Sequence, residues 1–310
     1  MPGAWQVTVT ASVSRLRCVP GRLSEMSLRR GPAALGRAGQ AGAFAALVLT
    51  MALASSLLGG RFLDPYGWIP LTAALVVWIA SGGDARRSIG AAFGVRSAAI
   101  RAWIPAIAIP AVVLPAGYLV AWATGSVRLD MQGTGVPLFG ITTVLIVIAA
   151  SLEAIGEELG WRGFLLPRLA GQGRVRAGLA SGSLWAVWHF PLIYIAAAYH
   201  PGAGPLYIVA FSITIVAMSF VANELRMDSG SAWPAVVFHG AHNGIWFQLQ
   251  SLVVGSSASL DRVGGESGIV PLALYSLVAL WIVAFRPAWR AEDRSAPAPI
   301  ERAILPNGTP

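Results

Sequence analysis

The chain has 310 residues, of which 55% are hydrophobic and only 12% are charged. A soluble domain is about 45–50% apolar and about 25% charged, so this composition excludes a water-soluble fold and a disordered chain. The formal charge of +8 does not indicate a nucleic-acid partner, because the basic residues are all arginines and lie mostly between apolar segments. The single cysteine, Cys18, excludes an internal disulfide. The composition therefore indicates a membrane protein whose main partner is the lipid bilayer.

Eight apolar segments approach the length of about 20 residues that a helix needs to cross a hydrocarbon core of roughly 30 Å. They are 41–60, 67–81, 102–124, 137–156, 177–199, 205–223, 232–254 and 268–285. None shows the alternating pattern of a transmembrane β-barrel, so the segments are expected to be helical. The predicted fold class is all-α, a polytopic helical membrane protein with about eight transmembrane helices.

The arginines predict the orientation of these helices. If the N-terminus is cytoplasmic, 19 of the 22 arginines lie in cytoplasmic tails and loops, and Arg61, Arg128 and Arg262 lie outside. Cytoplasmic loops of membrane proteins carry an excess of basic residues. We therefore expect a multi-pass protein of the plasma membrane with both termini in the cytoplasm.

The two ends of the chain are expected to be cytoplasmic tails around a transmembrane domain at 41–286. Residues 1–40 hold no apolar core that would form a signal peptide ahead of the first span. This N-terminal tail is over-long if the natural start is Met26. Residues 287–310 are rich in proline and charge and are predicted to be disordered.

Ionisable side chains within apolar spans are costly, and they therefore indicate function. Such residues occur in three places. Glu157, Glu158 and Arg162 lie near the end of the fourth span, His189 lies within the fifth, and His239 and His242 lie within the seventh beside the amide Asn243. Glu158 and Arg162 are four residues apart and share a helix face suited to a salt bridge. Glu157 points about 100° away from Glu158 and is available for a different role.

These side chains have the chemistry needed to hydrolyse an acyl bond. Glu157 and His189 could activate a water molecule, and His239 and Asn243 could donate hydrogen bonds to a developing oxyanion. No serine, cysteine or threonine nucleophile stands out. A zinc site is the chemical alternative, with His189, His239 and Glu157 as ligands, although the H-E-x-x-H pattern is absent.

Each signal also has a structural explanation when it is taken singly. A glutamate–arginine pair at a helix end is most often a structural ion pair, and a lone buried histidine is more often a hydrogen-bonded interior residue. The 12 tryptophans are expected to pack in the core or at the membrane interface, and we assign them no chemistry. A non-catalytic transport or immunity protein that uses the same polar cluster for binding is therefore the alternative of another class.

In their order and spacing, these motifs resemble the CAAX prenyl endopeptidase and bacteriocin-processing family of membrane proteases, also called the CPBP or Abi family. The family pattern is E-E-x-x-x-R, then an aromatic residue-x-x-x-H, then H-x-x-x-N, on separate transmembrane helices. The matching segments are Glu157-Glu158-x-x-x-Arg162, Trp185-x-x-x-His189 and His239-x-x-x-Asn243. The protease-like core would cover about 137–254. Trp185 stands where phenylalanine is usual, and His242 is an additional histidine without an assigned role.

The resemblance implies an intramembrane endopeptidase that hydrolyses a peptide bond of a membrane-associated protein or peptide. It implies that Glu157 and His189 activate water, and that His239 and Asn243 stabilise the oxyanion. By the same resemblance, Glu158 would be a supporting acid with Arg162 as its structural partner. We expect no cofactor, and a zinc-dependent version of the same protease is the alternative.

Overall fold

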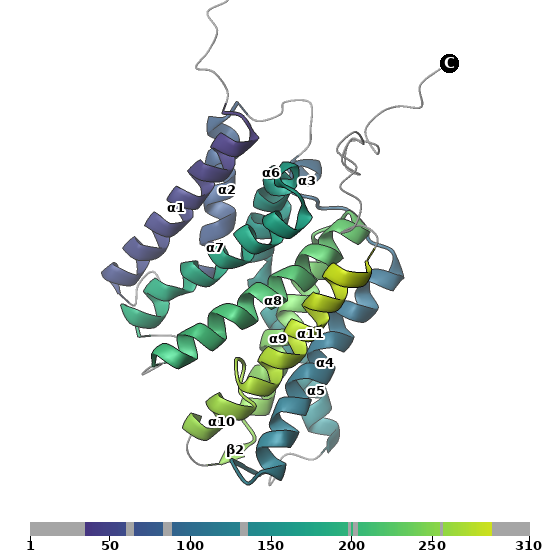
Figure 1. The fold of residues 1–310 in the computed structure, drawn as a ribbon. Coiled ribbons are helices and arrows are strands. Elements are labelled where there is room, and N and C mark those ends of the chain that lie inside the picture. The colour runs from purple at the N-terminus through teal and green to yellow at the C-terminus, as the bar shows by residue number, and fades with distance from the viewer. Residues whose placement is uncertain are drawn as a thin grey trace, which may run out of the picture. The chain divides into compact units, whose positions relative to one another are not determined.

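The computed structural model describes residues 35–59, 65–82, 89–130, 136–197, 200, 204–254 and 257–286 (Figure 1). The predicted C-terminal tail and residues 1–34 of the predicted N-terminal tail lie outside the described residues, as do Cys18 and Arg61. The described part is helical apart from two strands of two residues each. The all-α prediction is confirmed.

A helix occupies each of the eight regions where one was predicted. These helices are α1 (Arg37–Leu58), α2 (Ile69–Ala80), α4 (Ile100–Ala123), α5 (Val136–Glu158), α7 (Arg174–Tyr194), α8 (Pro205–Ser229), α9 (Trp233–Gln250) and α11 (Ile269–Phe285). Shorter elements connect them: η1 (Tyr66–Trp68), α3 (Ile89–Ala92), η2 (Leu159–Leu165), α6 (Leu166–Leu169), η3 (Ala170–Gln172) and α10 (Ser257–Val263). Strands β1 (Arg128–Leu129) and β2 (Val253–Val254) pair antiparallel, with Arg128 opposite Val254.

Four helical segments are long and apolar enough to cross a membrane. They are Arg37–Leu58, Ile100–Ala123, Leu138–Gln172 and Pro205–Ser229. Two further apolar helices, Tyr66–Ala80 and Ile269–Phe285, are shorter. The chain is therefore a multi-pass membrane protein, and the count of eight crossings stays a prediction.

The fourth helix continues well beyond residue 156, where its end was predicted. α5 leads into η2, which has π-helical geometry, and then into α6 and η3, so the helical segment runs without a break to Gln172. The charged residues that suggested a helix end are paired inside the protein, as described below, and therefore do not require water. Glu157 and Glu158 consequently lie within a long helix, next to a π-helical stretch of the kind often found at functional sites.

α5 and α9 make the most extensive helix–helix contact in the described structure. Two glycines on α9 permit it, because a Cβ at Gly240 would overlap Ser151 and a Cβ at Gly244 would overlap Val147. Small residues at such crossings allow helix backbones to approach closely. The close approach brings the histidine of the third motif beside the acidic pair of the first.

The outer face of α5 is apolar and exposed. Its exposed residues recur every three or four positions: Leu138, Ile141, Leu145, Ile148 and Leu152. We call this set the α5 stripe. In the most apolar part of the segment that contains α5, only 11% of the residues are buried, compared with 56% for α8. Because large exposed apolar surfaces indicate contact with lipid or protein, α5 is a peripheral helix that faces the bilayer.

Candidate active site

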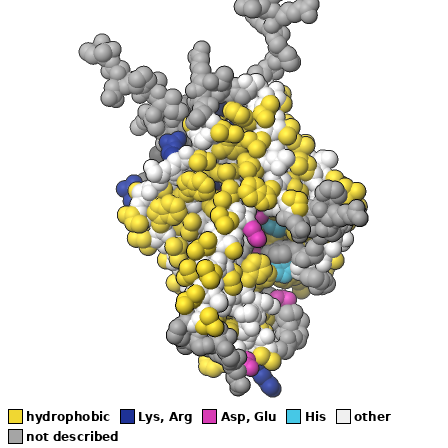
Figure 2. Space-filling view, turned by 180° about the vertical axis from the view of Figure 1, so that it is seen from behind, with side chains coloured by type: hydrophobic (Ala, Val, Ile, Leu, Met, Phe, Trp, Pro, Cys, Tyr) yellow, Lys and Arg dark blue, Asp and Glu magenta, His cyan; other side chains and the backbone are white. Residues whose placement is uncertain are grey.

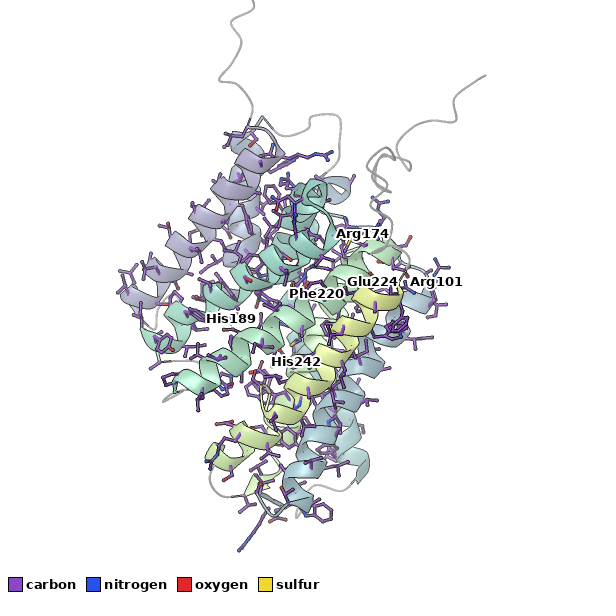
Figure 3. All side chains as sticks on the ribbon, in the orientation of Figure 1. Arg101, Arg174, His189, Phe220, Glu224 and His242 are labelled. Carbon is purple, nitrogen blue, oxygen red and sulfur yellow. The ribbon has the colours of Figure 1, made fainter. Side chains whose placement is uncertain are left out.

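The three motif segments meet at a cavity of about 250 Å³. Its walls include Glu157 from α5, His189 from α7, and His239 and Asn243 from α9. Figure 2 shows acidic and histidine side chains in a hollow of a face that is otherwise largely hydrophobic. Figure 3 labels His189 of α7 and His242 of α9, which both line this cavity. The structure therefore brings together, from three helices, the four residues that were predicted to be catalytic.

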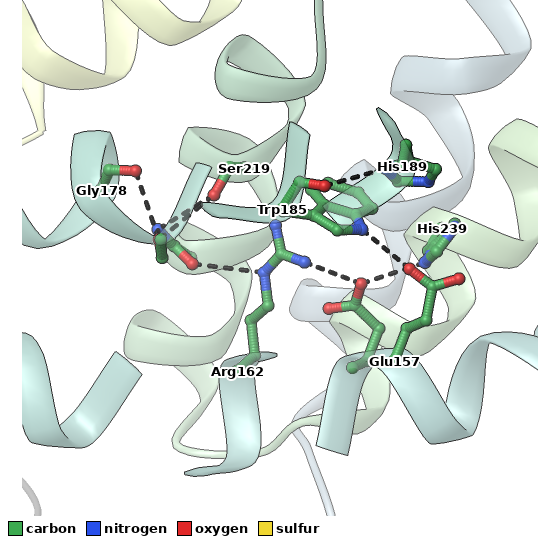
Figure 4. Close-up of polar contacts among 10 residues, drawn as sticks. Glu157, Arg162, Gly178, Trp185, His189, Ser219 and His239 are labelled. Atoms are coloured by element: carbon green, nitrogen blue, oxygen red, sulfur yellow. Dashed lines mark hydrogen bonds and ion pairs between the residues drawn. The ribbon is translucent and has the colours of Figure 1, made fainter. Parts of the chain in front are cut away.

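Glu158 and Arg162 form the predicted ion pair, and both are almost completely buried (Figure 4). Nη1 of Arg162 donates to Oε1 of Glu158 at 2.8 Å. The Arg162 Nε also donates to the side-chain oxygen of Asn223 on α8 at 3.3 Å, and its guanidinium carbon lies 4.3 Å from the centre of the Trp185 ring. The pair thus connects the fourth helical segment to α7 and α8.

Glu157 faces away from this ion pair, as its position on the helix predicted. Its side chain is half-buried at the cavity wall. Oε2 of Glu157 accepts a hydrogen bond of 2.7 Å from Nε1 of Trp185 on α7. The two adjacent glutamates therefore have separate partners, one pointing into the ion pair and the other lining the cavity.

The hydrogen bonds of the two motif histidines fix where their protons lie. Nδ1 of His189 is 2.9 Å from the carbonyl oxygen of Trp185, and Nδ1 of His239 is 3.0 Å from Oε1 of Glu158. A carbonyl or an ionised carboxylate can only accept, so both Nδ1 atoms carry a proton. In the neutral form of His189, the Nε2 atom then carries the lone pair and can accept a hydrogen bond.

A second buried polar network borders the same cavity, and sequence reasoning did not find it. Nε2 of His242 lies 3.4 Å from Oε1 of Glu266, and its Nδ1 lies 2.8 Å from the hydroxyl of Tyr275. The other carboxylate oxygen of Glu266 is 2.7 Å from Nε2 of His200. Glu266 and His242 also line the cavity. The additional histidine of the third motif therefore joins α9 to the segment that precedes α11.

Glu266 lies between α10 and α11, outside the predicted spans. Its burial would by itself raise the pKa of this carboxyl, but the hydrogen bonds and charges of His200 and His242 outweigh burial and hold the pKa well below its usual range. The only sequence signal for Glu266 was an acidic residue in a short polar segment before an apolar helix. Such a residue is normally solvated, which explains why it was missed.

The zinc alternative stays a prediction. Among the described residues, no group of three or more His, Cys, Asp and Glu side chains is placed together as a metal site. The hydrogen bonds at Nδ1 of His189 and His239 leave Nε2 as the ring atom that could face a ligand. No step described below is routed through a metal.

Comparisons with known proteins agree with the motif assignment. Residues 139–245 match the family model described as type II CAAX prenyl endopeptidase, Rce1-like. A curated relative, CAAX prenyl protease 2 of Methanococcus maripaludis, is 29% identical over 135 residues, which are 42% of this chain and 49% of the relative. The chain thus matches about half the length of that relative. Residues 139–245, which hold all three motifs, are therefore similar to the Rce1-like CAAX prenyl endopeptidases, and both comparisons support the CPBP family.

Proposed function

We propose that the chain is an intramembrane endopeptidase that cleaves a peptide bond of a membrane-associated protein or peptide. The observation that supports this function best is the convergence of Glu157, His189, His239 and Asn243 on one cavity. Three helices supply these groups, and all of them lie within the region that matches the family model. A carboxylate, two imidazoles and an amide provide a base and oxyanion donors without a protein nucleophile.

The first step is the attack of water on the carbonyl carbon of the scissile peptide bond. The carboxylate of Glu157 takes one proton from the water as the new carbon–oxygen bond forms. Nε2 of His189 accepts a hydrogen bond from the other hydrogen of the water and holds the molecule in place. This role needs the neutral tautomer of His189 in which Nδ1 donates to the Trp185 carbonyl and Nε2 carries the lone pair.

The tetrahedral intermediate carries a negative oxygen, which requires donors from the opposite wall. The side-chain N–H of Asn243 is one donor. His239 is the second in its protonated form, because Nδ1–H is committed to Glu158 and only the imidazolium has an N–H left at Nε2. Collapse breaks the carbon–nitrogen bond, and the carboxyl of Glu157 returns its proton to the leaving amine.

Glu158 and Arg162 act on this reaction through His239. The Glu158 carboxylate provides the negative charge next to the His239 ring and orients it, as second-layer carboxylates commonly do for catalytic histidines. Arg162 holds the Glu158 side chain in place through their ion pair. These two residues are positioning residues, since Arg162 bonds to Glu158 and Glu158 bonds to His239.

The substrate class that we propose follows from the name of the relative, CAAX prenyl protease 2. C-terminal C-a-a-X sequences carry a prenyl group on the cysteine. Such a lipidated peptide partitions into the bilayer, which the peripheral α5 helix contacts. A membrane-associated prenyl peptide is therefore the first probe to use.

We also propose that both termini lie in the cytoplasm of a cell whose plasma membrane holds the protein. The start of α1 and the end of α11 lie at the same end of the molecule in Figure 1, and α10 and β2 lie at the opposite end. Among the described arginines, Arg262 in α10 and Arg128 in β1, which pairs with β2, lie at that opposite end. This distribution supports the assignment because basic residues concentrate on the cytoplasmic side.

The test uses an internally quenched peptide that ends in a farnesylated C-a-a-X sequence, with the purified full chain in lipid vesicles. Wild type should cleave it, and mass spectrometry of the products identifies the bond. Glu157→Gln should lower kcat by about 10²–10⁴-fold, because the amide has the shape of the carboxylate but cannot take a proton. Asp228→Asn is the matched control, because Asp228 lies outside the cavity in a partly exposed ion pair with Arg286.

Two results would contradict the proposal in different ways. Near-normal turnover by Glu157→Gln would eliminate the glutamate mechanism and leave the protease assignment standing. No cleavage by wild type of the farnesylated peptide or of its unprenylated counterpart would favour the transport or immunity alternative.

A further inference from the structure

We propose that Trp185 is a positioning residue whose indole N–H holds the carboxylate of Glu157 in the orientation that takes a proton from water. This inference rests on the proposed function, in which Glu157 is the base. It assigns a role to the position at which this chain departs from the usual phenylalanine of its motif. Phenylalanine would supply the ring at this position but not the hydrogen-bond donor.

The hydrogen bond between the two side chains is short and partly buried. Nε1 of Trp185 lies 2.7 Å from Oε2 of Glu157, and Trp185 is 1% exposed. Hydrogen bonds to an ionised acceptor are shorter and stronger than neutral ones. With Oε2 held by the indole, the carboxylate cannot rotate freely, and Oε1 is the oxygen left for water. A base held in this way loses less conformational freedom when it reaches the transition state.

The same tryptophan also contacts Arg162 and the histidines His189 and His239. Its backbone carbonyl accepts from Nδ1 of His189 at 2.9 Å, which sets the tautomer of that ring. Arg162 lies over its ring, and the His239 ring packs against it edge-on with 5.2 Å between centroids. Figure 4 shows Trp185 between Glu157 and His189. One rigid residue therefore sets the relative positions of the base and both histidines.

Burial alone does not explain this hydrogen bond, because neighbouring tryptophans lack one. The indole nitrogens of Trp161 and Trp188 are buried and have no hydrogen-bond partner within the part of the chain that the structure describes. Both rings pack in the same core region, with 6.0 Å between their centroids. The fold thus tolerates buried indoles without an acceptor, whereas the indole of Trp185 is directed at the carboxylate that lines the cavity.

The test compares Trp185→Phe with Trp161→Phe in the farnesyl-peptide assay. Both substitutions remove an indole from the core, but only the first removes a donor from Glu157, and Trp161 does not line the cavity. We expect Trp185→Phe to lower kcat by about tenfold or more, the size expected for one hydrogen bond to a charged group, with KM changed by less than about twofold. Trp161→Phe should keep the wild-type kcat and KM.

A purely structural role for Trp185 would give a different result. A loss of turnover equal to that of Trp161→Phe, or a defect confined to KM with kcat unchanged, would overturn the positioning role. A second measurement needs no substrate: a double-mutant cycle of Trp185→Phe and Glu157→Met on thermal stability in detergent. We expect the two effects to be non-additive, because methionine removes the acceptor.

The cycle separates failure of this inference from failure of the proposed function. If wild type cleaves the peptide and the cycle shows additivity, the hydrogen bond does not exist and the inference is wrong while the function stands. If wild type cleaves nothing and the cycle shows coupling, the contact is real but the proposed function, and with it the catalytic role of Trp185, is refuted.

Discussion

Removal of Arg162 tests how strongly the buried ion pair holds the site together. Arg162 is 1% exposed and Glu158 is fully buried. Arg162→Met leaves the Glu158 carboxylate with His239 as its only remaining donor among the contacts described above. Breaking a buried pair on one side typically costs about 3–5 kcal/mol, because the remaining charge stays in a poorly solvated place. A loss of this size should lower the melting temperature by roughly 10 °C.

The double substitution Glu158→Leu with Arg162→Met should be less harmful than either single change. It removes both charges and leaves the Nδ1–H of His239 without its acceptor, which costs about 1–3 kcal/mol. The single losses would therefore exceed the double loss, and the coupling free energy should be at least about 3 kcal/mol. Thermal unfolding in detergent, followed by tryptophan fluorescence and circular dichroism, measures these terms.

Arg286→Met is the matched control for this experiment. Arg286 pairs with Glu224 and Asp228, but its side chain is 34% exposed. Exposed pairs contribute about 0–1 kcal/mol, so this variant should unfold close to wild type. If the single losses at residues 158 and 162 are small and add up to the double loss, the two side chains do not interact and the reasoning about the buried pair is refuted.

Two further predictions concern the second network and the metal. The folded protein holds the pKa of Glu266 below its unfolded value. This carboxylate therefore stabilises the fold above about pH 4, and the contribution is lost as the pH falls further. Glu266→Gln should weaken the acid dependence of the melting temperature, and an unchanged dependence would contradict the network. Purified enzyme should contain substoichiometric zinc and keep its activity after thorough chelation. One zinc per chain, with activity lost on removal and restored on addition, would instead establish the zinc-dependent protease.

The sequence predicted the helices and the spacing of the motifs because both depend on local patterns. Apolar segments of about 20 residues located all eight helices, and the four-residue spacing placed Glu158 and Arg162 on one face. The end of the fourth helix was wrong for a physical reason. Charged residues in a sequence look like a helix end in water, and only the tertiary structure shows that they are neutralised by each other and by neighbouring helices.

The contacts that the sequence could not predict all join distant segments. Trp185 was expected to pack without chemistry, yet its indole reaches Glu157, which is 28 residues away in sequence. Glu266 belongs to no recognised motif and meets His242 only because α9 and the segment before α11 lie together. Spacing along one helix cannot supply such information, because it depends on how helices cross.

The α5 stripe makes α5, the helix that carries Glu157, more exposed to its surroundings than α8 is. A helix with an outward apolar face responds to a mismatch between its length and the thickness of the hydrocarbon core by tilting. α5 and α9 are in close contact across Gly240 and Gly244, so they are expected to tilt together. A tilt of α5 relative to α7 should therefore change the distance between Glu157 and Trp185 more than the distance between Glu158 and His239. We therefore expect the acyl-chain length of the host lipid to act on the contact between Glu157 and Trp185, which makes membrane thickness a variable of the proposed chemistry.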